Sequence, residues 1–123
     1  MSMILDTACD SHIRKSLQGL QNIRVLKKGD FELYGAGGKS IQAEAIGTYM
    51  LKLPSEKILE LENYYYMPKI IKNIISIPLL LQRDYKINKK SNSCSISFFN
   101  KIFYHGVVNN DLLILSNDNI FSY

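Results

Sequence analysis

Short apolar runs that end at turn residues are the feature that most constrains the fold of this chain. Turn residues such as Gly29-Asp30 and the glycine-rich segment 35–38 interrupt runs of Ile, Leu, Tyr and Phe at intervals of roughly ten residues. Such spacing is typical of short strands joined by turns, and no apolar stripe of helical period persists along the chain. The pattern predicts an all-β domain, a small and mostly antiparallel barrel with at most one or two short helical turns.

The expected elements can be placed by residue range. The segment 31–53 is expected to form one long hairpin over the glycine-rich tip, and Gly47 in its second arm indicates a bulge or kink. A helical turn or two is expected near residues 79–83, and the segment 18–22 is expected to be irregular or helical. Strands are predicted near residues 3–6, 23–27, 31–34, 40–53, 57–66, 73–77, 85–88, 93–98, 101–105 and 111–115.

Length and composition bound the class of protein. The 123 residues suffice for one domain with a modest core, and 46% hydrophobic and 21% charged residues exclude wholesale disorder. Two cysteines, Cys9 and Cys94, are too few for a disulfide framework and indicate reduced thiols. No apolar run approaches the roughly 20 residues of a membrane span, and the first residues lack the pattern of a signal peptide. We therefore expect a cytoplasmic protein with no membrane partner.

The positive net charge of +4 has a local origin. Residues 69–101 carry seven Lys or Arg side chains against one Asp. Such a stretch could neutralise the phosphates of nucleic acid. A solvated loop and strand face in a Lys- and Asn-rich sequence is the simpler explanation, and no arginine cluster with interleaved aromatic residues favours nucleic acid.

The residues with the clearest chemical meaning stand near the N-terminus, where the apolar run 3–5 leads directly into Asp6-Thr7-Ala8. A carboxylate at the exit of a buried strand must be solvated, hydrogen-bonded or paired, because burying a lone charge is costly. A following threonine can hydrogen-bond the backbone, and a small third residue permits a tight turn. This is the local geometry that an aspartic peptidase needs, in which two carboxylates about 3 Å apart share one proton.

The chain contains only one such element, so a second carboxylate would have to come from another copy across a two-fold axis. The simpler alternative is that Asp6 only caps or braces a loop. A zinc site built from Cys9, His12, Cys94 and His105 is disfavoured, because ten residues separate the last two ligands. A Cys or Ser nucleophile paired with His105 lacks an oxyanion-hole signature. His12 is interpreted as a surface or structural residue, and no metal or cofactor is expected.

Several segments resemble one known family in order and spacing. Residues 4–13 are similar to an "apolar-apolar-Asp-Ser-Gly-Ala-Ser-x-His-apolar" opening, and residues 35–51 to a glycine-rich tip followed by "Gly-x-Gly-Thr-Val-x-Leu". Residues 61–68 resemble "Leu-x-Asn-Val-Leu-Tyr-Val-Pro", and residues 72–77 resemble "Lys-Asn-Leu-Leu-Ser-Val". These are motifs of the retropepsin-like β-barrel domain in copia-type retrotransposon Pol polyproteins, and the resemblance extends over essentially the whole chain.

The resemblance implies a function and a site. It implies one domain over residues 1–123, with an N-terminal strand that could be truncated and a C-terminal end that leads toward a pre-integrase region. It implies an aspartic endopeptidase that works as a homodimer on its own Gag-Pol polyprotein, in the cytoplasm or inside virus-like particles. Asp6 would be the catalytic residue, Thr7 would brace the loop with its hydroxyl group, and Ala8 would complete the motif. The substrate-covering flap would be formed by Gly35, Ala36, Gly37 and Gly38.

Two departures from the family pattern favour an alternative. Ala8 stands where the family has glycine, and Ala45 replaces the first glycine of the hairpin motif. Glycine permits backbone angles and close approaches that a Cβ atom can block. The alternative is a catalytically dead β-barrel that serves as a structural or assembly module of a transposon-derived protein.

Overall fold

The computed structural model describes residues 2–109, 112–116 and 121–122, and most of these residues lie in strands. The all-β class is therefore confirmed. No helix within these ranges has the length and apolarity that a membrane span requires. The elements are β1 (Ser2–Asp6), β2 (His12–Arg14), β3 (Leu20–Val25), β4 (Glu32–Tyr34), the 3-10 turn η1 (Ala36–Gly38), β5 (Ser40–Gln42), β6 (Ala45–Lys52), β7 (Ile58–Tyr66), β8 (Asn73–Ser76), α1 (Ile77–Gln82), β9 (Tyr85–Lys90), β10 (Ser93–Phe98), β11 (Lys101–Asn109), β12 (Leu112–Ser116) and β13 (Phe121–Ser122).

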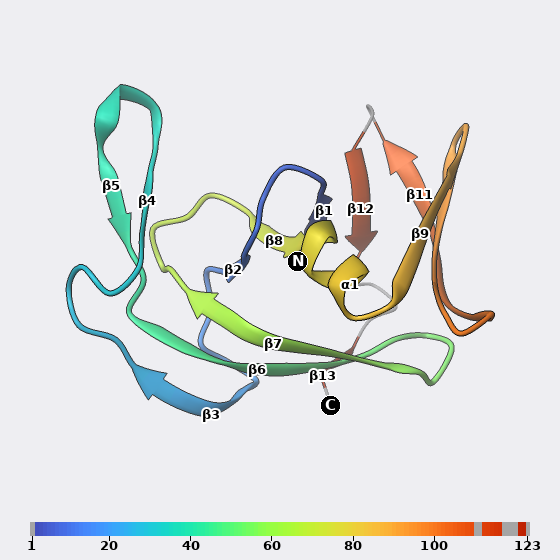
Figure 1. Cartoon of the computed structure of the whole chain (residues 1–123), viewed down its shortest axis with the longest axis horizontal. Helices are drawn as coiled ribbons and strands as arrows, with labels where there is room; N and C mark the ends of the chain where they lie inside the picture. Colours follow the sequence, from blue (N-terminus) through green and yellow to red (C-terminus); the bar gives the residue numbers. More distant parts are fainter. Residues whose placement is uncertain (1, 110–111, 117–120, 123) are drawn as a thin grey trace.

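The strands form one large, strongly bent sheet in the order β13-β6-β7-β2-β8-β1-β12-β11-β10-β9, and β3 shares an edge of β6 with β13. Figure 1 shows β3, β6 and β7 as one layer, with β8 and β1 above it and with β12, β11 and β9 standing upright beside them. Pairing is mostly antiparallel, as predicted, and the parallel pairs are β1 with β8 and β2 with β7. The expectation that the sheet closes into a barrel is wrong for the described residues. The sheet ends at β9 on one side and at β3 and β13 on the other, and these ends do not pair with each other.

The predicted long hairpin over 31–53 is also wrong in its extent. β4 and β5 form a separate two-stranded sheet, and the chain then changes partner within two residues. The Ala43 N–H still donates to the Phe31 carbonyl of the hairpin, whereas the Glu44 N–H donates to the Tyr66 carbonyl of β7. The strand that follows therefore belongs to the large sheet. The expected irregularity at Gly47 is confirmed as a register shift between Gly47 and Tyr49.

Three local differences from the expected elements have simple causes. Leu20 and Gln21 begin β3 rather than a helical or irregular segment, because they pair with Tyr49 and Thr48 of β6, whereas Asn22 lies in an irregularity of that pairing with a φ of 53°. The helix starts at Ile77, earlier than predicted, because the Ser76 hydroxyl caps it by accepting a hydrogen bond from the Leu79 N–H. β2 was not predicted, since its sequence His-Ile-Arg is mostly polar, yet all three residues are buried.

Two apolar clusters hold the strands together. The larger one, with Leu51, Leu59, Leu61, Ile75 and Ile96 fully buried, lies between the β6–β7 layer and the strands above it. The smaller cluster lies under the β4–β5 hairpin. Its buried members are Ile13, Ala43 and Met67, and Cys9, Leu26, Phe31, Leu33, Ile41, Tyr65, Ile70 and Ile74 pack against them.

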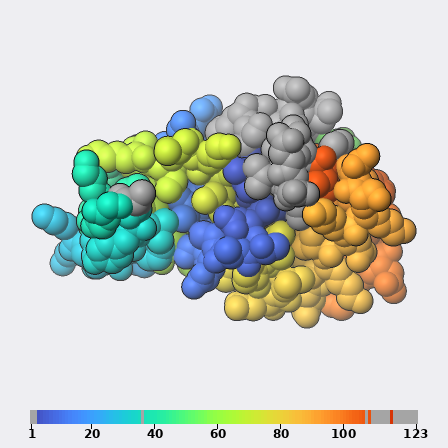
Figure 2. Space-filling view, turned by 90° about the horizontal axis from the view of Figure 1, so that it is seen from above, coloured from blue at the N-terminus to red at the C-terminus, as the bar shows by residue number. Residues whose placement is uncertain are grey.

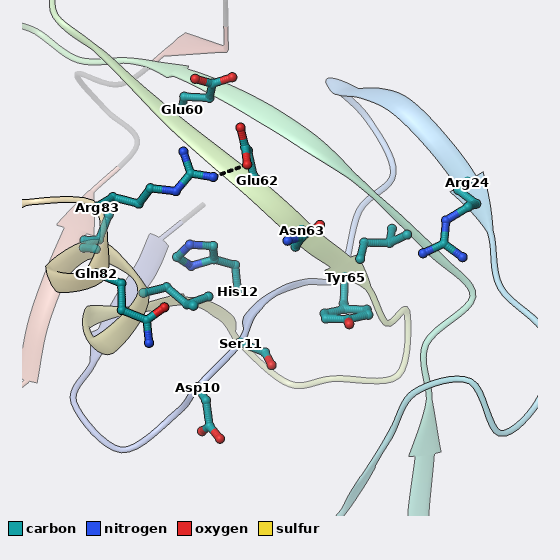
Figure 3. A pocket seen from close by; sticks show the side chains of 13 residues that line it. Asp10, Ser11, His12, Arg24, Glu60, Glu62, Asn63, Tyr65, Gln82 and Arg83 are labelled. Atoms are coloured by element: carbon teal, nitrogen blue, oxygen red, sulfur yellow. Dashed lines mark hydrogen bonds and ion pairs between the residues drawn. The ribbon is translucent and has the colours of Figure 1, made fainter.

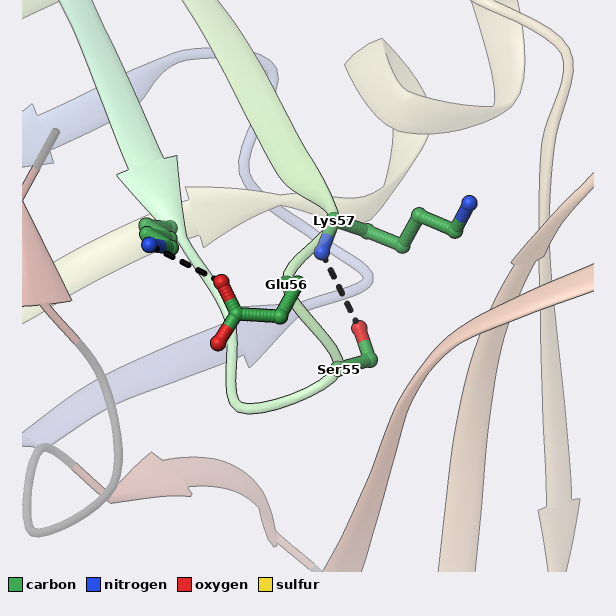
Figure 4. Close-up of polar contacts among 4 residues, drawn as sticks. Ser55, Glu56 and Lys57 are labelled. Carbon is green, nitrogen blue, oxygen red and sulfur yellow. Dashed lines mark hydrogen bonds and ion pairs between the residues drawn. The ribbon is translucent and has the colours of Figure 1, made fainter.

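The turn between β6 and β7 ties these strands to β11. Glu56 adopts a left-handed φ of 69° and pairs with Lys52, 2.9 Å away across the turn. The Ser55 hydroxyl accepts a hydrogen bond from the Lys57 N–H (Figure 4) and donates one to the Phe103 carbonyl of β11. The β6–β7 hairpin is therefore anchored to the C-terminal strands at its turn as well as through the core.

Gly47→Ala is expected to lower the free energy of unfolding by about 1–3 kcal/mol. A Cβ atom there would lie 2.8 Å from the Gln21 carbonyl oxygen of β3, so one backbone must move. Gly35→Ala is the matched control, because its φ of −89° suits alanine and its nearest contact is an ordinary 3.7 Å. Urea unfolding followed by circular dichroism measures both. Equal effects of the two substitutions would contradict the close approach of β3 at Gly47.

Candidate active-site loop

The loop that follows Asp6 is positioned by an unusual crossing of strands. β8 lies between β1 and β2, parallel to β1 and antiparallel to β2. Residues 7–11 must therefore cross the end of β8 to connect its two neighbours, and Figure 1 shows this loop arching above the sheet. Met3 and Leu5 are buried and anchor β1, whereas Asp6 is half-buried at its end, opposite Ser76 in the register.

The Asp6 carboxylate organises the start of this loop. Its Oδ1 atom accepts a hydrogen bond of 2.8 Å from the Ala8 N–H, which closes a tight turn. The side chains of Thr7 and Ala8 are exposed. Ala8 is not among the described residues with positive φ, so its Cβ causes no backbone strain within the protomer.

Ser76, at the end of β8, fixes the rest of the loop by hydrogen bonds. Its hydroxyl donates a hydrogen bond of 2.6 Å to the Cys9 carbonyl and accepts one from the Leu79 N–H. Its backbone N–H donates to Nδ1 of His12, at 2.9 Å. One fully buried serine therefore joins the loop, the strand β2 and the start of α1.

His12 was expected to be a surface or a structural residue. It is structural, because only 3% of it is exposed. Because Nδ1 accepts the Ser76 hydrogen bond, the neutral ring carries its proton on Nε2. Burial, reinforced by the positive charge of Arg83, lowers the pKa of His12 to about 4. The ring lies 5.5 Å from that of Tyr64. The loop is therefore held by a histidine that stays neutral near pH 7.

The predicted flap residues Gly35, Ala36, Gly37 and Gly38 form the tip of the β4–β5 hairpin, where Gly37 and Gly38 both adopt a φ of 77°. The hairpin and the loop after β1 project toward the same side of the molecule in Figure 1. Figure 2 looks onto that side and shows the blue N-terminal segment between the teal hairpin and the orange residues of β9 and β10.

The base of the hairpin and the Asp6 loop also share the smaller apolar cluster. The Phe31 ring stacks on Tyr65 at 3.8 Å, and Cys9 packs against the same cluster from the loop. The structure thus brings the two predicted site segments onto one face and connects them through a common packing unit.

A polar cavity of about 480 Å³ lies beside the loop, between β7 and α1. Figure 3 shows His12 among its lining side chains, with the ion pair of Arg83 and Glu62 at one end and Arg24 at the other. Asp10 and Ser11 also line it, whereas Asp6, Thr7 and Ala8 do not. The cavity is therefore separate from the Asp6 carboxylate, although both belong to the same loop.

The four side chains considered for zinc do not converge. Within the described ranges, no three His, Cys, Asp or Glu side chains come together as metal ligands would. Burial raises the pKa of the Cys9 thiol, which also donates a hydrogen bond to the Ser11 carbonyl. A raised pKa keeps this cysteine in its unreactive thiol form.

Ser76 is the residue at this site whose individual role the sequence did not reveal. The family resemblance implied that the segment 73–76 packs behind the catalytic loop, but it gave the serine no hydrogen-bonding role of its own. A signal was present, because a serine two residues before Pro78 is a typical start of a helix. Its second use, holding the loop across β8, depends on strand order.

An all-β fold with one half-buried aspartate, Asp6, at the end of a core strand defines a small β-domain that presents one carboxylate at this strand end. The chain belongs to the Pol polyprotein beta-barrel domain family, whose family model matches residues 3–85, from β1 to the first residue of β9. A search of curated proteins and a search of solved structures each found no significant match.

Proposed function

We propose that this chain is one half of a retropepsin-like aspartic endopeptidase, which cleaves a Pol polyprotein of the copia type as a homodimer. The observation that carries the proposal is the position of Asp6. It ends a core strand, is half-buried, and begins a surface loop that is held by its own carboxylate and by Ser76. A residue that served only as a cap would not need this second support from a strand distant in sequence.

The chemistry follows from pairing two such loops across a two-fold axis. Two Asp6 carboxylates brought within about 3 Å cannot both ionise, so they share one proton. The protonated partner polarises the carbonyl of the peptide bond, and the ionised partner takes a proton from the attacking water. The Ala8 N–H orients one oxygen of each carboxylate, which supports a fixed orientation of the pair.

Ala8 is less of an obstacle than the sequence indicated. Its side chain is exposed and its backbone is not in the left-handed region that favours glycine. Within one protomer, the alanine is therefore compatible with the loop. Any cost of its Cβ atom must arise against a second copy or a bound peptide, and the comparison of Ala8 with glycine measures that cost.

A peptide-library assay at mildly acidic pH tests the proposal. Wild-type chains are expected to cleave internal peptide bonds, detected by mass spectrometry, with activity per chain that rises with protein concentration. Ala8→Gly is expected to change the cleavage rate by less than about tenfold, because the loop already tolerates alanine. Absence of cleavage by both chains, under conditions where a folded dimer is measured, would favour the structural module instead.

A further inference from the structure

The outer face of the sheet β9-β10-β11 has an unusual composition. Tyr85 and Ile87 of β9, and Cys94 and Ile96 of β10, face the core. Because side chains alternate along a strand, the residues between them face solvent. On this outer face, Lys86, Asn88 and Lys90 of β9 lie directly opposite Ser97, Ser95 and Ser93 of β10. The result is a row of basic and amide side chains beside a strip of small hydroxyl residues.

No carboxylate balances this charge along the three strands. Residues 85–109 contain four lysines and one histidine and no Asp or Glu. Exposed lysines on an edge strand also prevent unwanted strand pairing, and β9 is such an edge. That role alone does not require the neighbouring strands to lack acidic residues, so the charge pattern fits a polyanionic partner.

An exposed aromatic side chain stands at one end of the same sheet. Phe99 and Asn100 form the two-residue turn between β10 and β11, with φ values of 47° and 65°. Asn and Gly suit this conformation, whereas a bulky residue there is an outlier. Phe99 is nevertheless 73% exposed, and its ring meets the Phe98 ring edge-on, with the ring centroids 4.4 Å apart. A strained aromatic residue that is exposed to solvent indicates a functional role, such as binding, rather than a role in stabilising the fold.

Phe99 lines a recess of about 470 Å³. The other walls come from Leu81, Asp84, Tyr85, Lys86 and Asn100. Leu81 is 52% exposed, so both apolar walls are open to solvent. Lys86 belongs to the recess and to the outer face, which places the recess at the Lys86 end of the row formed by Lys86, Asn88 and Lys90.

We propose that this face binds single-stranded nucleic acid, with one base in the recess against Phe99 and the backbone along Lys86 and Lys90. Lysines neutralise phosphates, and an aromatic surface stacks on any base. Asn100 and Asp84 supply a donor and acceptors to the edge of the base. A duplex would hide its bases from this recess, and the outer face lies beyond the residues that the family model matches. The proposal does not depend on peptidase activity.

The charge part of the proposal is tested with a fluorescein-labelled oligouridine of about 20 nucleotides, by anisotropy at several salt concentrations. The logarithm of the affinity is expected to fall with the logarithm of salt with a slope near −1.4, for two phosphate contacts at Lys86 and Lys90. Lys86→Glu combined with Lys90→Glu is expected to weaken binding more than about tenfold. Lys27→Glu combined with Lys28→Glu makes the same change of charge in the exposed loop before β4 and is expected to leave the affinity within about twofold.

The base part is tested with Phe99→Gly, which suits the positive φ and therefore should not destabilise the turn. It is expected to weaken oligouridine binding by about fivefold to a hundredfold, the loss of one stacked base. The proposal is overturned by no binding at low salt, by equal effects of the two lysine pairs, or by unchanged affinity of the Phe99→Gly chain. Equal binding of inorganic polyphosphate, or preferential binding of phosphatidylserine vesicles, also overturns it.

Discussion

Chains that carry Asp6→Asn are expected to inhibit wild-type chains when the two are mixed. If each active dimer needs two Asp6 carboxylates, a mixed dimer has only one and lacks the ionisable partner. With random pairing, a ninefold excess of the variant should leave about a tenth of the activity that the same wild-type chains show alone. The variant alone should lose activity by about a thousandfold or more, since it cannot act as a general base.

Asp10→Asn is the matched control for this experiment. Asp10 is an exposed carboxylate four residues later on the same loop. It lines the polar cavity, which Asp6 does not. Because dimers that contain this variant keep both Asp6 carboxylates, it is expected to add activity rather than inhibit the wild type. Cleavage of the peptide library, followed at a fixed concentration of wild-type chains, measures both mixtures. Activity that is indifferent to excess Asp6→Asn chains would contradict a site shared between two copies.

The free energy of unfolding is expected to fall by about 3 kcal/mol as the pH drops from 7 to below 4. The pKa of His12 is about 4 in the folded protein and 6.5 for an ordinary histidine. The unfolded chain therefore binds a proton before the folded chain does. The stability is present above pH 6.5, and it is lost progressively as the pH falls toward 4. The difference of about 2.5 between the pKa of His12 in the unfolded chain and in the folded protein sets the size of the effect.

His12→Asn isolates this contribution, because the amide oxygen of Asn can accept the Ser76 hydrogen bond and stays uncharged at every pH. The variant is expected to lose most of the pH dependence between 6.5 and 4. His105→Asn, which changes an exposed histidine on β11, is expected to keep it. Urea unfolding at several pH values measures the three chains. A pH slope in the His12→Asn chain equal to that of the wild type would show that other groups cause the acid sensitivity.

This acid sensitivity bears directly on the proposed peptidase. Protonation of Nδ1 would remove the acceptor of the Ser76 N–H and place a charge near Arg83 in the cavity. The loop after Asp6 depends on the same serine for its contact with Cys9. Activity should therefore be measured between about pH 5 and pH 6, where the carboxylate pair can share a proton and His12 remains mostly neutral.

Most strands could be predicted because their local signals agree. The segments 57–66 and 93–98 alternate apolar and polar residues between turn signals, and both form strands close to the expected bounds. β2 could not be predicted, because His12 and Arg14 flank its one apolar residue. Arg14 is buried all the same, since its guanidinium lies 4.1 Å from the centre of the Tyr49 ring, a favourable cation–π arrangement. Only the packing of distant strands creates that environment.

The candidate site divides in the same way. The sequence alone singled out Asp6, Thr7, Ala8 and the glycine-rich tip, because the roles of charged, small and turn-forming residues can be inferred from their immediate neighbours. The sequence did not reveal the support from Ser76 and His12, because a hydrogen bond between residues 64 positions apart has no local signature. Strand order decides that bond, since β8 must insert between β1 and β2.

The sequence by itself determined the all-β class, most strand positions, the place of Asp6 at the end of an apolar run, and the family. These depend on turn residues, side-chain alternation and motif order, which act over a few residues. The tertiary structure alone decided that the sheet stays open through its described strands, that the β4–β5 hairpin separates from β6, and that His12 is buried and neutral. These depend on which distant strands pair, because partner changes such as that between Ala43 and Glu44 are set by packing across the whole domain.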